Sequence, residues 1–175
     1  VKTGLVKTGF GTLPAVALFA YFITFHTYGT WLHGREEGSV DREHNVRGEP
    51  LLSPDREREH AERGALKHPP IVLDERARAI VVETIREVCR HRGWTVRALH
   101  VRTNHVHVVV SAVAAPEKVL TDFKAYSTRR LREAGLIGPE TRVWSHHGST
   151  KYLDSPESAQ RAIEYTDHYQ GEPLP

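Results

Sequence analysis

The feature that most limits the fold of this chain is a pair of predicted strands that lies, in the sequence, between two predicted helices. Residues 95–101 and 105–112 are rich in β-branched residues and are separated by three residues, which predicts an antiparallel hairpin. Residues 74–92 begin at a capping aspartate and end before a glycine, as an amphipathic helix does. Residues 116–134 begin with a proline and predict a second helix. All-helical and all-β folds are therefore excluded.

Three further elements flank this unit. The apolar residues 19–26 predict a buried first strand, and residues 142–153 predict a fourth strand. Ser155-Pro156 opens a last helix that runs to about residue 170. The order is then βαββαβ followed by one helix, which is the split βαβ arrangement. We expect an α+β, ferredoxin-like fold: an antiparallel sheet with two helices on one face and the C-terminal helix across the open face.

The length of 175 residues fits one domain. We expect a loosely ordered leader over residues 1–18 and a single domain over 19–175, with a long insertion loop at 27–73. The charge run 55–63 within that loop can form a short helix. Residues 13–25 are apolar enough for a signal peptide, but no small-residue cleavage site follows and the stretch is too short to span a membrane.

The cysteine count fits a reducing compartment. The one cysteine, Cys89, excludes internal disulfides and multi-cysteine zinc sites. We expect a cytoplasmic location. The net charge is only +2, yet 18 of the 24 basic residues are arginine, the residue that binds phosphates in a bidentate way. A codon bias towards arginine explains the same excess, so this count alone does not identify a nucleic-acid-binding protein.

The sequence His105-Val106-His107 is the first candidate for chemistry. Alternate residues of a strand share a face, so both imidazoles project the same way, and two imidazoles at this spacing can bind one divalent metal ion. Two solvent-exposed histidines would give the same tripeptide. A third ligand would be needed, and the available residues are Asp167, His168, Gln170, His146 and His147. An oxygen ligand among them would suit Mg²⁺ or Mn²⁺.

Two tyrosines are candidate nucleophiles. Tyr165 flanks the narrow apolar stripe of the last helix, and it can approach the histidines if that helix crosses the open sheet face. The alternative is an aromatic that only packs the helix onto the sheet. Tyr126 follows Phe123 by three residues on the second helix, which favours core packing or base stacking.

Three segments of the chain resemble a known family. The segment Leu99-His-Val-Arg-Thr-Asn-His-Val-His-Val-Val-Val110 is similar to the HUH strand of single-tyrosine transposases, the small bacterial insertion-sequence enzymes and their REP-associated relatives. Phe22-Ile-Thr-Phe-His-Thr-Tyr-Gly-Thr-Trp31 looks like the first strand of one branch. Val143-Trp-Ser-His-His-Gly-Ser-Thr-Lys-Tyr-Leu153, followed by a helix bearing Glu164-Tyr-Thr-Asp-His-Tyr-Gln-Gly-Glu172, also looks like this branch.

The resemblance implies a metal-dependent single-stranded DNA endonuclease and strand transferase that acts through a 5′-phosphotyrosine. Tyr165 would be the nucleophile, and His105 and His107 would bind Mg²⁺ or Mn²⁺. In much of the family a third ligand lies four residues after the tyrosine, whereas Gln170 is five residues on and would face away on an ideal helix. The resemblance also implies a nucleoid-associated homodimer that binds single-stranded or hairpin DNA and needs no nucleotide cofactor.

The DNA would be held by basic residues of the second helix and the following strand. Their phosphate contacts would make binding sensitive to salt. These residues are Lys124, Arg129, Arg130, Arg132 and Lys151.

Three other functions remain open at this point. A domesticated relative would bind DNA or RNA hairpins while cutting them weakly or not at all. A metal-dependent phosphoesterase would use water, and Tyr165 would then be dispensable. An unrelated ferredoxin-like ligand-binding domain would carry its histidines incidentally. Covalent trapping of DNA separates the transposase from all three.

Overall fold

A computed structural model of the chain describes residues 20–31 and 55–168. The predicted leader and residues 32–54 of the predicted insertion loop lie outside these residues. Within the loop, the charge run forms a helix. The elements, in chain order, are β1 (Ala20–Thr27), α1 (Arg56–Gly64), α2 (Glu75–Arg92), β2 (Thr95–Val101), β3 (His105–Ser111), α3 (Pro116–Glu133), β4 (Trp144–Leu153) and α4 (Pro156–His168).

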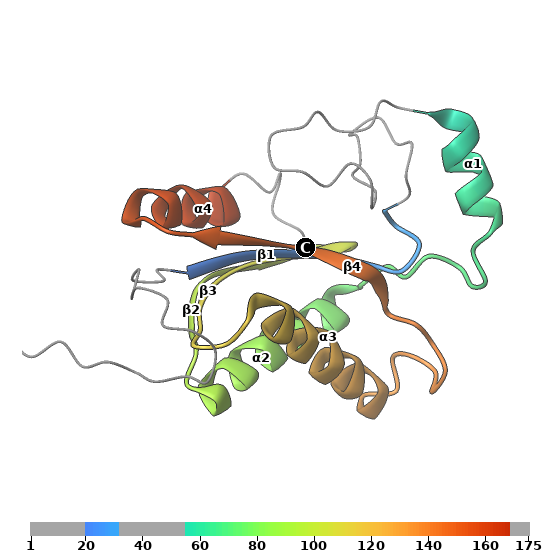
Figure 1. Cartoon of the computed structure of the whole chain (residues 1–175). Helices are drawn as coiled ribbons and strands as arrows, with labels where there is room; N and C mark the ends of the chain where they lie inside the picture. The colour runs from blue at the N-terminus through green and yellow to red at the C-terminus, as the bar shows by residue number, and fades with distance from the viewer. Residues whose placement is uncertain (1–19, 32–54, 169–175) are drawn as a thin grey trace, which may run out of the picture.

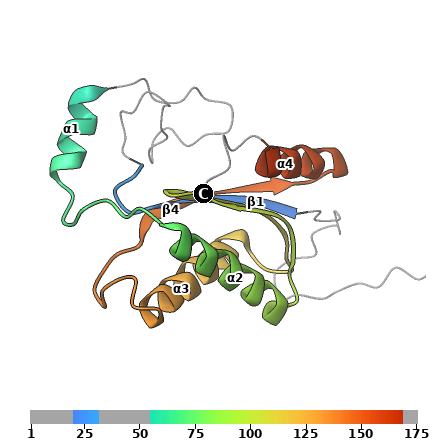
Figure 2. The ribbon, with the colours of Figure 1, turned by 180° about the vertical axis from the view of Figure 1, so that it is seen from behind.

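The four strands form one antiparallel sheet in the order β2-β3-β1-β4. Helices α2 and α3 cover one face, and α4 lies on the other, as Figures 1 and 2 show from opposite sides. Helix α4 contacts all four strands. The expected α+β, ferredoxin-like fold with a C-terminal helix across the open face is therefore confirmed. None of the helices in the described ranges is long and apolar enough to cross a membrane.

The ends of α2 follow from local signals. The Asp74 side chain accepts a hydrogen bond of 2.7 Å from the backbone N–H of Ala77, which satisfies a donor that the first helical turn leaves without a partner. Gly93 ends the helix with φ at 68°, a conformation that costs glycine little. These caps place β2 directly after the helix, and β2 then pairs with β3 through the predicted hairpin.

The alternation of side chains along β3 decides which residues face the functional side. Val106, Val108 and Val110 are completely buried in the main core against α2 and α3. Val109 packs on the other face in a smaller cluster that includes Ala162 of α4. Because neighbouring residues of a strand point to opposite faces, the histidines of β3 stand on the same side as α4.

Candidate active site

Four histidines gather on the sheet face that α4 crosses. In the strand register, His26 of β1 lies opposite His105, and His100 of β2 lies opposite His107. Residues directly opposite one another in antiparallel strands point to the same face. The ring centroids of His105 and His107 are 4.7 Å apart, and those of His26 and His105 are 5.5 Å apart. The predicted pair is thus the centre of a larger imidazole cluster.

Each histidine of the pair is held through its Nδ1 atom. His107 Nδ1 is 2.8 Å from the hydroxyl of Thr24, and His105 Nδ1 is 2.7 Å from Oδ1 of Asn104. An amide oxygen only accepts hydrogen bonds, so Nδ1 of His105 carries the proton and its Nε2 carries the lone pair. This is the arrangement by which proteins orient imidazoles that bind metal ions.

Burial keeps His107 in its neutral form. Only 8% of this residue is exposed, and burial lowers the pKa of the imidazole to about 3, with a further lowering from the neighbouring histidines. Burial also lowers the pKa of His100, and Arg102 adds to the effect, while a hydrogen bond to the backbone of Thr166 opposes it. Near pH 7 the His107 ring therefore has a lone pair available, as a metal ligand requires.

Helix α4 brings Tyr165 to this cluster. The buried residues Ala162 and Thr166 fix the helix on the sheet, and Tyr165 lies on the flank that faces β1. Its ring centroid is 5.7 Å from that of His107 and 6.0 Å from that of Phe22. Phe22 in turn stacks on His107 at 5.4 Å. Tyr165 remains 45% exposed, so part of the residue is accessible from solvent.

Four of the five residues considered as a third ligand lie in the described part of the chain. Gln170 lies outside the described residues. His168 is exposed at the last described turn of α4, and Asp167 interacts with His100. His146 and His147 are exposed on β4, which β1 separates from β3. In the part of the chain that the structure describes, no group of three or more His, Cys, Asp or Glu residues is placed to hold a metal ion.

Most of the predicted DNA contacts lie away from the histidines. Lys124, Arg129, Arg130 and Arg132 belong to α3, on the opposite side of the sheet, as does the rival nucleophile Tyr126. Only Lys151 shares the histidine face, since it is exposed on β4 directly opposite Phe22.

Two of the α3 cations make close bonds within the protein. Lys124 donates to the carbonyl oxygens of Ser145 and His147 at 2.9 and 3.0 Å, and burial, with Arg142 nearby, lowers its pKa to about 8. Arg130 binds both carboxylate oxygens of Glu87 at 2.7 Å and so joins α3 to α2. Arg132 makes a longer contact of 3.4 Å with a loop carbonyl.

Sequence reasoning missed several residues of the cluster. Phe22, Thr24 and His26 alternate along β1, so a period-two pattern already places them on one face. The pattern does not give the register between β1 and β3, which places these residues beside His105 and His107 on the same face of the sheet. The outward positions of the first strand, taken with an expected β1–β3 pairing, were the signal that could have found them.

The His107 environment predicts how stability depends on pH. The folded-state pKa is about 3 and the ordinary value is 6.5, so the unfolded chain binds more protons between these values. The contribution of His107 to the free energy of unfolding is therefore complete above pH 6.5 and decreases as the pH falls towards 3. With a chelator present, urea unfolding gives the free energy of unfolding at pH 7 and at pH 5. Between these pH values the free energy of unfolding of wild type is expected to fall by about 1–2 kcal/mol more than that of His107→Gln. Parallel stability curves would contradict this assignment.

The chain is similar to known transposases. A sequence model of the family described as "Transposase IS200 like" matches residues 67–163, which include His105 and His107 and end two residues before Tyr165. No curated protein sequence matches the chain. A solved REP-associated tyrosine transposase bound to a REP hairpin is 11% identical, with a TM-score of 0.48. That match covers 84% of this chain and 63% of the other.

A second solved structure, a candidate transposase from Deinococcus radiodurans R1, is 16% identical with a TM-score of 0.44. The match covers 91% of this chain and 95% of that one. The family match itself spans more than half of the 175 residues. The chain belongs to the IS200-like transposase family.

Proposed function

We propose that this transposase is a metal-dependent single-stranded DNA endonuclease and strand transferase with Tyr165 as its nucleophile. The observation that carries the proposal is the position of the Tyr165 ring, 5.7 Å from that of His107 and partly exposed. A phenol beside a pair of oriented imidazoles, on the open face of a sheet, suits attack on a phosphodiester.

The histidine pair fits a divalent cation such as Mn²⁺ or Mg²⁺. Both rings are oriented through Nδ1, and His107 is buried and neutral. A bound cation would withdraw charge from the non-bridging oxygens of the scissile phosphate. Gln170 remains the proposed third ligand from the sequence, although it lies outside the described residues.

The chemistry of the chain's own residues is a transesterification. The Tyr165 phenol loses its proton and its oxygen forms a bond to phosphorus, while the bond from phosphorus to the 3′ oxygen breaks and that oxygen takes up a proton. The products are a 5′-phosphotyrosine and a 3′-hydroxyl. A 3′-hydroxyl of another strand reverses the step and releases Tyr165, so the phosphodiester energy is conserved and no nucleotide cofactor is needed.

The proposed substrate is single-stranded or hairpin DNA. Lys151 is the contact that we propose beside the active site, because it is exposed opposite Phe22. The internal bonds of Lys124 and Arg130 favour a structural role for those two cations. A homodimer located at the nucleoid is the arrangement that we expect for the chain in the cell.

A covalent trapping experiment tests the function. The chain is mixed with Mn²⁺ and labelled single-stranded DNA from the flanks of its own gene, and a denaturing gel is examined for a protein–DNA band. We expect a band that chelator abolishes. Salt-sensitive binding without a band would contradict the enzyme and favour a hairpin-binding module. Free cleavage products without a band would instead indicate hydrolysis by water.

A further inference from the structure

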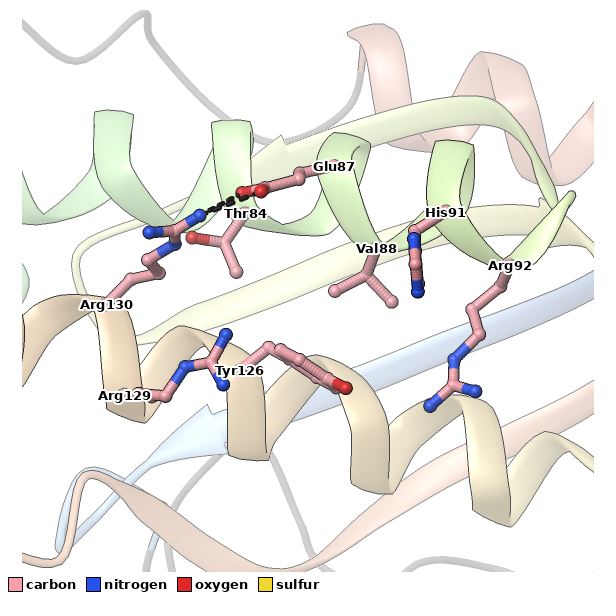
Figure 3. Close-up of a pocket in the computed structure, with 8 residues that line it drawn as sticks. All are labelled: Thr84, Glu87, Val88, His91, Arg92, Tyr126, Arg129 and Arg130. Carbon is pink, nitrogen blue, oxygen red and sulfur yellow. Dashed lines mark hydrogen bonds and ion pairs between the residues drawn. The ribbon is translucent and has the colours of Figure 1, made fainter.

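A basic groove lies between α2 and α3, on the side of the sheet away from the histidines (Figure 3). Its cavity volume is about 290 Å³. Six of the residues that line it are Glu87, His91, Arg92, Tyr126, Arg129 and Arg130.

The two helices that form the groove carry a net positive charge. Together α2 and α3 contain ten Lys and Arg against six Asp and Glu, a net charge of +4. The whole chain has a net charge of only +2, so the remainder is net negative. Helix α4, beside the histidines, contains one Arg and three carboxylates. A polyanion is therefore attracted to the α2–α3 side.

Cationic side chains from both helices face the same hollow. The guanidinium carbon of Arg129 lies 4.9 Å from the ring centroid of Tyr126, and 59% of the Arg129 side chain is exposed. Figure 3 shows the Tyr126 ring extending along the groove, with His91 and Arg92 projecting from α2 above it. The groove thus has N–H donors on two sides, which suit the oxygens of a phosphate, and the Tyr126 ring supports one of them, the Arg129 guanidinium.

The arginines of the groove also have carboxylate partners. Arg92 pairs with the buried Asp122 at 3.1 Å, and Arg129 contacts Glu133 at 3.6 Å. Arg130 is engaged on both sides, by Glu87 and by Glu133. A guanidinium has five N–H donors, so a single carboxylate partner does not exhaust it. Arg129 has the longest of these ion pairs, which makes it the best phosphate contact, whereas Arg130 acts as the clamp between the helices.

We propose that the α2–α3 groove is a second DNA-binding site, which takes the sugar-phosphate backbone and leaves the bases outside. This inference rests on the proposed function, because it assumes that DNA is the substrate. Contacts from arginine to phosphate oxygens carry no information about the bases, so binding at this groove is independent of sequence. Such a site would hold DNA on the face opposite Tyr165 while the active site cuts.

Fluorescence anisotropy with a labelled single-stranded oligonucleotide tests the groove. The measurements use the full chain carrying Tyr165→Phe, which prevents adduct formation, between about 50 and 200 mM salt. Arg129→Gln is expected to weaken binding about 3- to 10-fold and to reduce the slope of log affinity against log salt by about 0.7. Arg129→Lys, which keeps the charge, is expected to restore part of the affinity.

Arg86→Gln is the matched control. Arg86 is an exposed arginine of α2 that pairs with Glu83 one turn away and does not line the groove. The substitution Arg86→Gln removes the same charge as Arg129→Gln, and we expect it to change the DNA affinity less than twofold. If Arg86→Gln and Arg129→Gln weaken DNA binding equally, or if neither weakens it, the proposed DNA site in the groove is wrong. A covalent adduct formed by wild type would still support the proposed enzyme in that case. A wild type that neither binds DNA nor forms an adduct would overturn both proposals.

Discussion

Tyr165→Phe is expected to reduce the covalent protein–DNA adduct by at least about 10³-fold, because it removes the oxygen that bonds to phosphorus. DNA binding is expected to stay within about twofold of wild type, since the ring and its contacts with Phe22 and His107 remain. Denaturing gels measure the adduct, and anisotropy measures binding. A combined loss of adduct and binding would point to damaged folding.

Two other tyrosines provide controls for this substitution. Tyr152 is exposed on β4, where its ring packs against Tyr21. Tyr169 follows Tyr165 by four residues in the sequence. Tyr152→Phe and Tyr169→Phe are each expected to retain the adduct. An adduct that survives Tyr165→Phe but disappears with Tyr169→Phe would identify Tyr169 as the nucleophile and contradict our assignment.

His107→Ala is expected to weaken Mn²⁺ binding by about 100-fold or more. The substitution removes a buried, neutral imidazole that its neighbours already orient. Losing even an outer contact of a metal ligand commonly costs 10- to 100-fold in affinity, and losing the ligand itself costs at least as much. Titration calorimetry or the electron paramagnetic resonance signal of free Mn²⁺ gives the affinity without reference to catalysis. His105→Ala, at a more exposed position, is expected to have a similar effect.

The hydroxyl of Thr24 provides a graded test of the same site. Thr24→Val removes the hydrogen bond to His107 and is expected to reduce Mn²⁺ affinity about tenfold, whereas Thr24→Ser keeps the hydroxyl and the affinity. His146 lies on the exposed part of β4, and His146→Ala is expected to leave the Mn²⁺ affinity unchanged. Equal Mn²⁺ affinities of His107→Ala and wild type would show that the histidine pair does not bind the metal.

Much of the fold could be predicted because its signals are local. The cap at Asp74, the stop at Gly93 and the proline at the start of α3 each act within one helical turn. The spacing of His105 and His107 placed both imidazoles on one face, and the open sheet face suggested where α4 would lie. The short helix α1 was also suggested by its charge run.

The rest depends on contacts between distant segments. His26 and His100 join the cluster through the register of β1 and β2 on β3, which no single strand specifies. Lys124 resembled a surface cation in the sequence, yet it folds against the carbonyl oxygens of β4. Side chains of this length can cover apolar surface and bind backbone groups at the same time, so helical position alone did not decide their role.

Mass spectrometry of the trapped adduct tests the central claim most directly. After reaction with Mn²⁺ and single-stranded DNA, nuclease and trypsin digestion would leave the tryptic peptide that begins at Ala162 carrying the nucleotide. We predict that fragmentation places the modification on Tyr165. A nucleotide on Tyr126, on Tyr169 or on a serine would contradict the account, as would DNA cleavage and joining with no modified peptide.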